Sequence, residues 1–274
     1  MVQAEVPVSD ALVQPMERVA DGVRGLRIGF VNVFGVMHAN GSWTLIDAGV
    51  PYSAGYIRRW AEREFGGPPN AIVLTHGHFD HVSGAPQLAN DWDLPVYAHR
   101  LEAPYLSGER EYPPPRTGAG GGLMSLLAPI YPRGSVDMGH RLRLLSETAY
   151  ILQTSALPEW QIVHTPGHTA GHVSLFRPAD HTLLVGDAFC TTKPESFFEA
   201  TLVQEPELHG PPAYFTEDFV AAADSIRRLA LLRPRVLAPG HGKPLAGAGV
   251  KKKLERLSKQ FIREVLRDDR REAA

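Results

Sequence analysis

Short apolar runs separated by glycine, proline and small polar residues mark the first half of the chain. Apolar runs of this length, rich in β-branched and aromatic residues, are typical of strands. The pair Asn40-Gly41 between two such runs indicates a tight hairpin turn. A helix is predicted over 52–65, because apolar residues such as Ile57 and Trp60 recur on one helical face. Strands are predicted at 26–28, 31–37, 43–46, 71–74 and 95–98, and shorter helices at 82–89 and 99–106.

The second half repeats this broad order of strands, a helix and strands. Thr216 is suited to N-cap a helix, because the acidic residues Glu217 and Asp218 follow it in the favoured first turn. An amphipathic pattern predicts a last helix over 251–266. Strands are predicted at 142–145, 160–163, 173–176, 182–185 and 235–238. The sequence therefore predicts an α/β fold whose order of elements is doubled.

Residues 107–140 interrupt this regularity with proline and glycine clusters around a short apolar stretch at 123–130. A connection this long and irregular is usually functional or mobile. Two interpretations stay open: the apolar stretch forms a lid or a wall of a substrate pocket, or the region packs on the surface or on a second subunit. We expect an N-terminal arm at 1–18 and a single domain at 19–274 that contains this insertion.

The composition is that of a globular protein with enough residues for a sizeable core. The chain has 274 residues, of which 43% are hydrophobic. A formal net charge of -2 without a long basic block gives no support for a nucleic-acid partner. The single cysteine, Cys190, cannot form a disulfide within the chain. No apolar run is long enough for a membrane span and residues 1–10 lack a secretion signal, so we expect a cytoplasmic protein.

The stretch from Thr75 to His81 contains three histidines and one aspartate, directly after the apolar run 71–74. Imidazole and carboxylate groups are ligands suited to zinc, iron or manganese. Alternate positions on a loop can face one metal ion while the next pair faces another. A solvated polar turn is the other interpretation. So short a stretch cannot complete the coordination of two ions, so further histidine and aspartate ligands are expected downstream.

Candidates of that kind occur later in the chain. His168, Asp187 and His241 each stand just past an apolar run and beside glycine or proline. Glycine allows the tight turn that brings such a side chain inward. A lone histidine is more often a structural residue than a ligand. The repeated context at the end of a strand nevertheless favours ligands at these positions.

These motifs resemble those of the metallo-β-lactamase superfamily. The resemblance spans about residues 19–241 and implies a four-layer αββα sandwich with the metals at one edge. It rests on His-x-His-x-Asp-His at 76–81, Thr-Pro-Gly-His-Thr at 165–169, Gly-Asp at 186–187, Gly-His-Gly at 240–242 and Leu-Ile-Asp-Ala-Gly at 45–49.

The resemblance also assigns the ligands by position. Asp47 is expected to orient a ligand histidine, with a simple turn residue as the alternative. The expected cofactors are two divalent metal ions per chain, zinc first, with iron and manganese as alternatives. The implied ligands are His76, His78 and His168 for the first ion, Asp80, His81 and His241 for the second, and Asp187 as the bridge between them.

Paired metal ions imply hydrolysis, because a water between two divalent cations becomes a nucleophilic hydroxide near neutral pH. Asp80 is expected to orient that hydroxide or to pass a proton to the leaving group. His164 and His172 are expected to brace the loop around His168. The remaining histidines lack the strand-end context and are expected to be structural or exposed: His38, His99, His140, His181 and His209.

The substrate is less clearly indicated. Lactonases of this superfamily that cleave acyl-homoserine lactones often carry a tyrosine three residues after the bridging aspartate. Cys190 stands there in this chain, which weakens the prediction of that particular activity. Tyr214 could supply a phenol from another loop, or it could pack as an aromatic residue before a helix.

The sequence thus predicts a metal-dependent hydrolase of a small ester, lactone or related substrate. A thioesterase, a β-lactamase and a phosphoester hydrolase of the same fold are alternatives. An oxidoreductase resembling a mononuclear-iron persulfide dioxygenase and a non-catalytic metal-binding protein are alternatives from other classes. The expected partner is a small-molecule substrate, with neither nucleic acid nor membrane, and a homodimer is left open.

Overall fold

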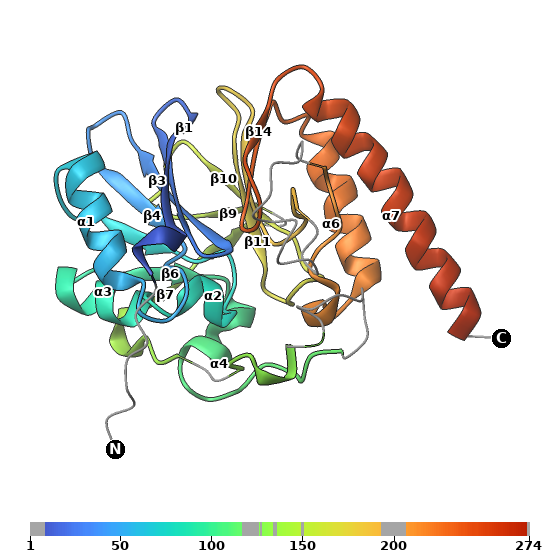
Figure 1. Ribbon diagram of the computed structural model, residues 1–274, viewed down its shortest axis with the longest axis horizontal. Helices are drawn as coiled ribbons and strands as arrows, with labels where there is room; N and C mark the ends of the chain where they lie inside the picture. Colours follow the sequence, from blue (N-terminus) through green and yellow to red (C-terminus); the bar gives the residue numbers. More distant parts are fainter. Residues whose placement is uncertain are drawn as a thin grey trace. The chain divides into compact units, whose positions relative to one another are not determined.

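The computed structural model describes residues 9–116, 126, 128–133, 136–148, 151–192 and 207–272 (Figure 1). Contacts within the chain group it into two compact units, each with its own sheet. The first unit comprises Met1–Tyr112, Pro132–Leu145 and Thr154–Leu157. The second comprises Pro113–Tyr131, Ser146–Gln153 and Pro158–Ala274. The single domain expected at 19–274 stays a prediction.

The described residues of the first unit form a sheet whose strands follow chain order. Strands β1 to β4 pair antiparallel and strands β4 to β7 pair parallel. Parallel neighbours need a crossover connection, and the helices α1 (Ala54–Phe65) and α3 (Ala85–Trp92) lie within the first two of these crossovers. The strands are β1 (Val13–Ala20), β2 (Val23–Ile28), β3 (Val31–Met37), β4 (Trp43–Ile46), β5 (Ala71–Val73), β6 (Val96–Ala98) and β7 (Leu142–Leu144).

Helix α1 packs onto this sheet through the apolar face that its sequence predicts. Trp60 of that face is buried in the core of the first unit together with Leu45 and Ile72 of the sheet. Gly35 in β3 leaves room for the end of the helix, since a Cβ there would lie 2.3 Å from the Phe65 ring. The Phe65 ring also stacks on Trp43, with ring centroids 4.1 Å apart.

The helix predicted at 82–89 has wrong boundaries, because two separate helices cover this part of the chain. A short helix α2 (Phe79–Val82) precedes α3, and Gly84 lies between the two. A Cβ at Gly84 would lie 2.4 Å from the carbonyl oxygen of Ala48, so this tight approach requires glycine. The helix predicted at 99–106 is a 3-10 turn (Arg100–Glu102) followed by α4 (Ala103–Leu106).

The described residues of the second unit form another sheet, in which all neighbours are antiparallel except β12 and β13. Helix α6 (Phe219–Leu231) makes the crossover between those two strands. It packs with α7 (Val250–Glu272) against the sheet, and Ile226, Leu254 and Phe261 are part of that core. The strands are β8 (Ser146–Thr148), β9 (Ile151–Gln153), β10 (Gln161–His164), β11 (Val173–Arg177), β12 (Thr182–Gly186), β13 (Val236–Pro239) and β14 (Leu245–Ala246).

The sequence pattern missed some elements and misplaced others. Strand β1 begins inside the arm predicted at 1–18 and pairs with β2. Strands β8, β9 and β14, which have two or three residues each, were not predicted. The N-cap predicted at Thr216 is wrong: Asp218 caps α6, and its side chain accepts a hydrogen bond of 2.9 Å from the Ala221 N–H.

Part of the apolar stretch at 123–130 can be placed. Ala128 is buried beside Tyr214, in a 3-10 turn (Ala128–Ile130), whereas Leu126 and Ile130 are each 76% exposed. Residues 123–125 and 127 lie outside the described part of the chain. Among the helices that are described, none combines the length and apolar character needed to cross a membrane.

Candidate metal centre

The histidine-rich stretch lies in the first unit, directly after β5. The chain leaves the sheet at Leu74, and His78 occupies the position before the first residue of α2. The helix then carries Asp80 and His81. All four predicted ligands of this stretch are buried in the structure.

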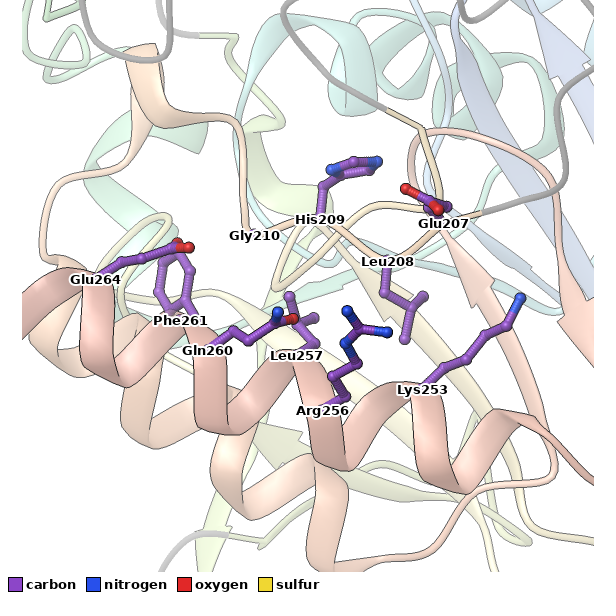
Figure 2. Close-up of a pocket in the computed structure, with 10 residues that line it drawn as sticks. All are labelled: Glu207, Leu208, His209, Gly210, Lys253, Arg256, Leu257, Gln260, Phe261 and Glu264. Carbon is purple, nitrogen blue, oxygen red and sulfur yellow. The ribbon is translucent and has the colours of Figure 1, made fainter.

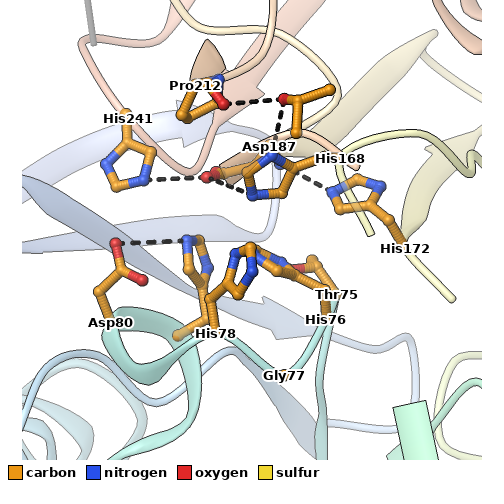
Figure 3. A network of polar contacts seen from close by, with 12 residues as sticks. Thr75, His76, Gly77, His78, Asp80, His168, His172, Asp187, Pro212 and His241 are labelled. Atoms are coloured by element: carbon orange, nitrogen blue, oxygen red, sulfur yellow. Dashed lines mark hydrogen bonds and ion pairs between the residues drawn. The ribbon is translucent and has the colours of Figure 1, made fainter. Parts of the chain in front are cut away.

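His76 and His78 face each other through ring nitrogens. The Nε2 atom of His76 lies 3.0 Å from Nδ1 of His78 (Figure 3). The Thr75 hydroxyl lies 2.9 Å from the Asp47 carboxylate and 3.0 Å from Nδ1 of His76. Because a carboxylate only accepts, Thr75 donates to Asp47 and accepts from His76. This assigns the proton of His76 to Nδ1 and the lone pair to Nε2.

Asp47 lies at the end of β4 in the left-handed region, with φ at 61°, which aspartate tolerates better than most residues. Its Oδ2 atom accepts a hydrogen bond of 2.8 Å from Nδ1 of His81. Its Oδ1 atom accepts one of 2.8 Å from the Thr75 N–H. His81 therefore has its lone pair on Nε2, which lies 4.0 Å from Oδ2 of Asp80.

The other three predicted ligands lie in the second unit, each at the end of a strand. His168 is in the loop between β10 and β11, Asp187 follows β12 and His241 follows β13. The Oδ2 atom of Asp187 lies 3.5 Å from Nε2 of His168 and 3.0 Å from Nε2 of His241 (Figure 3). Both imidazoles of this group thus face one carboxylate oxygen.

Thr216 orients His168 from the segment before α6. The Thr216 hydroxyl donates a hydrogen bond of 2.8 Å to the carbonyl of Pro212. It therefore accepts from Nδ1 of His168, which lies 3.3 Å away, and the lone pair of His168 is on Nε2. Gly167 allows the His168 loop to lie close to α6, because a Cβ at this position would lie 2.3 Å from the backbone nitrogen of Ala222.

His172 supports Asp187 through the main chain. Its Nε2 atom accepts a hydrogen bond of 2.8 Å from the Asp187 N–H, so its proton is on Nδ1. That proton is donated to the Thr165 hydroxyl at 2.8 Å. Thr165 lies 3.2 Å from the hydroxyl of Ser174, which donates to the carbonyl of Val185 at 2.7 Å. A buried chain of hydrogen bonds thus joins three segments around the Asp187 turn.

The expectation that both flanking histidines brace the His168 loop agrees with their contacts. Nε2 of His164 lies 2.9 Å from the carbonyl oxygen of Ala170, in the same loop. His38 and His99, expected to be structural, are both buried. His38 lies 2.8 Å from the Thr44 hydroxyl, and the His99 ring accepts from the Leu101 N–H.

Cys190 and Tyr214, the two predicted substrate-side residues, are buried in the second unit. The Cys190 backbone pairs with that of His209 in a single antiparallel bridge. The Tyr214 ring lies 5.0 Å from that of Phe215, and its carbonyl accepts a hydrogen bond from the Arg116 N–H at 2.9 Å. These contacts describe packed side chains, and a role toward the substrate stays a prediction for both.

Several residues that contact the predicted ligands or the loops around them were not predicted from the sequence. A contact between Thr75 and a predicted ligand could have been expected from the sequence, because Thr75 directly precedes His76. Thr216 was noticed only as a helix cap. Glu102 and Tyr112 contact Gly77, which lies between two predicted ligand histidines. Both residues lie so far along the chain that no local pattern marks them.

A separate pocket of about 520 Å³ lies in the second unit, between α7 and residues 207–210 (Figure 2). None of the predicted ligands lines it. Lys253 and Arg256 on α7 are accompanied by the acidic side chains of Glu207 and Glu264, so the lining does not favour one class of charged ligand.

Comparisons with known proteins decide the family. A family model described as "Metallo-beta-lactamase superfamily" matches residues 26–241, which include every predicted ligand. The chain belongs to the metallo-beta-lactamase superfamily. The probable metallo-hydrolase YflN of Bacillus subtilis is 42% identical over 246 residues, which cover 88% of this chain and 92% of that protein. A hydroxyacylglutathione hydrolase of Xylella fastidiosa is 30% identical over 137 residues, which cover 50% of this chain and 38% of that protein.

Solved structures, including that of a metallo-beta-lactamase, share the fold. A metallo-beta-lactamase from Erythrobacter litoralis matches with a TM-score of 0.61 and 18% identity, over 92% of this chain and 99% of its own. TTHA1623 in a di-iron-bound form matches with a TM-score of 0.54 and 25% identity, over 79% of this chain and 89% of its own. The predicted fold class is confirmed, and the chain is a metallo-hydrolase of the metallo-beta-lactamase superfamily.

The donor groups within each unit suit the divalent metals that metallo-beta-lactamase proteins bind. Neutral imidazoles and carboxylates are the ligands of catalytic zinc sites. In the first unit Nε2 of His76 and Nδ1 of His78 lie 3.0 Å apart, close to the separation of about 3.3 Å expected for two nitrogens on one tetrahedral zinc ion. In the second unit both histidines direct Nε2 toward Asp187. The residues therefore fit the metal that the family implies.

Proposed function

We propose that the protein is a dinuclear, zinc-dependent hydrolase of a small ester, lactone or related substrate. A shared pattern at three buried histidines carries the proposal. In His76, His81 and His168 a side-chain oxygen accepts the Nδ1 proton, which makes Nε2 the ligand atom. Histidines that bind metals are commonly oriented in this way. The proposed ligands are His76, His78 and His168 for one ion, Asp80, His81 and His241 for the other, and Asp187 for both.

Bound metal ions would supply a Lewis acid for the scissile carbonyl and lower the pKa of a water nucleophile. Asp187 is suited to be a ligand shared by both groups of proposed ligands, since Nε2 of His168 and Nε2 of His241 face the same carboxylate oxygen. Asp80 has a second carboxylate oxygen, which is suited to orient a water molecule or to pass a proton to the leaving group. Asp47 and Thr216 keep His81 and His168 in the tautomer that coordination requires.

An ester or lactone substrate with an apolar portion is supported by the exposed side chains of Leu126 and Ile130 in the 107–140 region. A thioester is the second candidate, favoured by the similarity to a hydroxyacylglutathione hydrolase. Iron is the first alternative metal, because TTHA1623 is known in a di-iron-bound form. We also propose that the protein acts in the cytoplasm on a small molecule, without nucleic acid.

Metal analysis tests the dinuclear part of the proposal. Purified protein is stripped with a chelator, reloaded with zinc and measured by mass spectrometry of the bound metal. Two ions per chain are expected. Fewer than about 1.5 ions per chain after full reloading would contradict the dinuclear site, because a complete ligand set of this kind binds zinc tightly near neutral pH.

A panel of lactones, esters, thioesters, β-lactams and phosphate esters tests the substrate class. Hydrolysis of a lactone or ester is expected, and it should be lost in His78→Ala and Asp187→Ala. His140→Ala is the matched control, because that histidine is exposed and outside both ligand groups. Turnover of a thioester alone would replace the preferred substrate class. Oxygen consumption with a persulfide would instead identify the oxidoreductase.

A further inference from the structure

A buried carboxylate and a buried phenol lie beside the ligand stretch of the first unit. Glu102 is 1% exposed and Tyr112 is 4% exposed. Glu102 ends the 3-10 turn after β6, and Tyr112 lies near the start of the 107–140 region. Neither residue belongs to a motif of the family resemblance, and neither is a proposed ligand. A charged group at this depth is costly unless hydrogen bonds compensate for its lost hydration.

Those hydrogen bonds come from the ligand stretch itself and from Tyr112. The Gly77 N–H donates to Oε2 of Glu102 at 2.9 Å. The Tyr112 hydroxyl donates to the same carboxylate oxygen in a short contact, and it also lies 3.0 Å from the Gly77 nitrogen. The peptide between His76 and His78 is therefore attached to a fixed acceptor. A hydrogen bond to an ionised carboxylate is stronger than one between neutral groups.

The position between the two histidines has room only for glycine. A Cβ at Gly77 would lie 2.5 Å from the Tyr112 hydroxyl oxygen and 3.2 Å from Oε2 of Glu102. The glycine of the histidine motif is thus required here by packing against this pair.

Tyr112 also contacts a ligand ring. Its ring lies 4.5 Å from that of His78, at an interplanar angle of 60°. Its ring also stacks on Tyr105 at 3.9 Å, and its backbone N–H donates to the carbonyl of Arg133 at 3.2 Å. Since the phenol is held by its ring, its hydroxyl and its backbone, it can hold the His78 ring in turn.

We propose that Glu102 and Tyr112 are positioning residues for the metal ligand His78. They fix the Gly77 peptide and the His78 ring so that Nδ1 of His78 stays 3.0 Å from Nε2 of His76. They also join the start of the 107–140 region to the ligand stretch, because Tyr112 lies in that region and contacts Gly77 and the His78 ring. The inference rests on the proposed function, in which His76 and His78 bind the same ion.

Cobalt substitution tests the inference, because the absorption of bound Co²⁺ reports the geometry of its ligands. The variants are Tyr112→Phe, which keeps the ring and removes the hydroxyl, and Glu102→Gln, which keeps the shape and removes the charge. Glu109→Gln is the control, since Glu109 is an exposed acid of the same region. Metal affinity is measured by competition with a chelator, and unfolding of the metal-free proteins is followed in urea.

We expect one of the two cobalt ions to bind 10- to 100-fold more weakly in both variants, roughly the loss found when residues behind metal ligands are changed. The cobalt spectrum should change, and kcat should fall more than KM rises. The control should match the wild-type protein in all measurements. Glu102→Asp, which restores the charge, should recover part of the lost affinity.

Wild-type spectra and affinities in both folded variants would overturn the inference, even if the metal-free variants unfold in less urea. That outcome would mean that the pair stabilises the fold without positioning His78. A wild-type protein that binds no metal would contradict the proposed function, and the positioning role with it. The two failures are distinguishable, because the first leaves metal binding by the wild-type protein intact.

Discussion

Oδ2 of Asp47 accepts a hydrogen bond of 2.8 Å from Nδ1 of His81, and the two residues are 34 positions apart in the chain. Both side chains are buried. The same carboxylate accepts hydrogen bonds from the backbone and hydroxyl of Thr75, which in turn accepts from His76. One carboxylate at the end of β4 thus sets the tautomers of two proposed ligands.

Replacing Asp47 by Asn should weaken metal binding by about 10- to 100-fold, because an amide has one acceptor oxygen where the carboxylate has two. At least one of the His81 and Thr75 donors would lose its partner, which should also lower the free energy of unfolding of the metal-free protein by about 1–3 kcal/mol. Chelator competition and urea unfolding measure the two effects. Asp21→Asn is the control, because that side chain is 89% exposed. Unchanged metal affinity in folded Asp47→Asn would refute this orienting role.

His172→Ala should disturb the second ligand group. It leaves the Asp187 N–H and the Thr165 hydroxyl buried without the imidazole between them. We expect a loss of about 2–4 kcal/mol of stability in the metal-free protein, from lost hydrogen bonds and a new cavity. Metal affinity should fall as well, because the Asp187 backbone loses its support. His164→Ala is the matched control and should cost less than about 1 kcal/mol, since the hydrogen bond between its ring and the Ala170 carbonyl lies near the surface. Equal losses of stability and of metal affinity in the two variants would contradict the proposal that His172 supports the Asp187 backbone.

Gly84→Ala should be strongly destabilising. A Cβ there would lie 2.4 Å from the Ala48 carbonyl oxygen and 2.8 Å from the Ser53 hydroxyl, and a backbone atom cannot move aside without disturbing β4. Overpacking of this kind costs about 1–3 kcal/mol or more. Gly55→Ala in α1 is the matched control: the nearest atom would be 3.7 Å away, at the end of the Arg59 side chain. That control should be neutral or stabilise the protein by about 0.4–1 kcal/mol. Denaturant unfolding of both variants measures the difference.

Asp180 should contribute stability that depends on pH. Partial burial raises the pKa of its carboxyl group, but hydrogen bonds from Arg177 and Thr182 outweigh that effect and lower the pKa below its ordinary value. A lowered pKa in the folded state stabilises the fold above the unfolded pKa of about 3.9, and this contribution is lost as the pH falls through the folded pKa.

The corresponding variant is Asp180→Asn, compared with the wild-type protein by urea unfolding without metal. At pH 7 it should be less stable by at most about 1 kcal/mol, because the carboxylate is 35% exposed and solvent screens the ion pair. The difference should shrink below about pH 4, because the carboxyl group of the unfolded chain is protonated first, and it should vanish below the lower pKa of the folded state. A difference of the same size at pH 7 and pH 3 would contradict the ionic origin of the effect.

Much of the fold could be predicted because its signals are local. The hairpin turn around Asn40-Gly41 and the runs of β3 and β4 appear in the structure within the predicted boundaries. The positions of the ligand candidates at strand ends could also be predicted. The signal is a short-range pattern, in which glycine or proline stands next to a histidine after an apolar run. The family resemblance added the expected role of each ligand.

Thr216 shows where local reasoning fails. Its sequence context favours a helix cap, and Asp218 takes that position in the structure. Thr216 instead accepts a hydrogen bond from His168, 48 residues earlier in the chain. A threonine hydroxyl can cap a helix or hydrogen-bond a histidine ring, and the folded structure determines which partner lies near it.

By itself, the sequence determined most of the strands and the longer helices, the imidazole and carboxylate groups suited to a metal, and the superfamily. The tertiary structure decided which oxygen accepts each Nδ1 proton, and it alone placed Glu102 and Tyr112 against Gly77. The physical reason is the range of the interactions. Strand and turn preferences arise between neighbours in the chain, whereas a hydrogen bond to a ligand histidine forms only after distant segments have packed together.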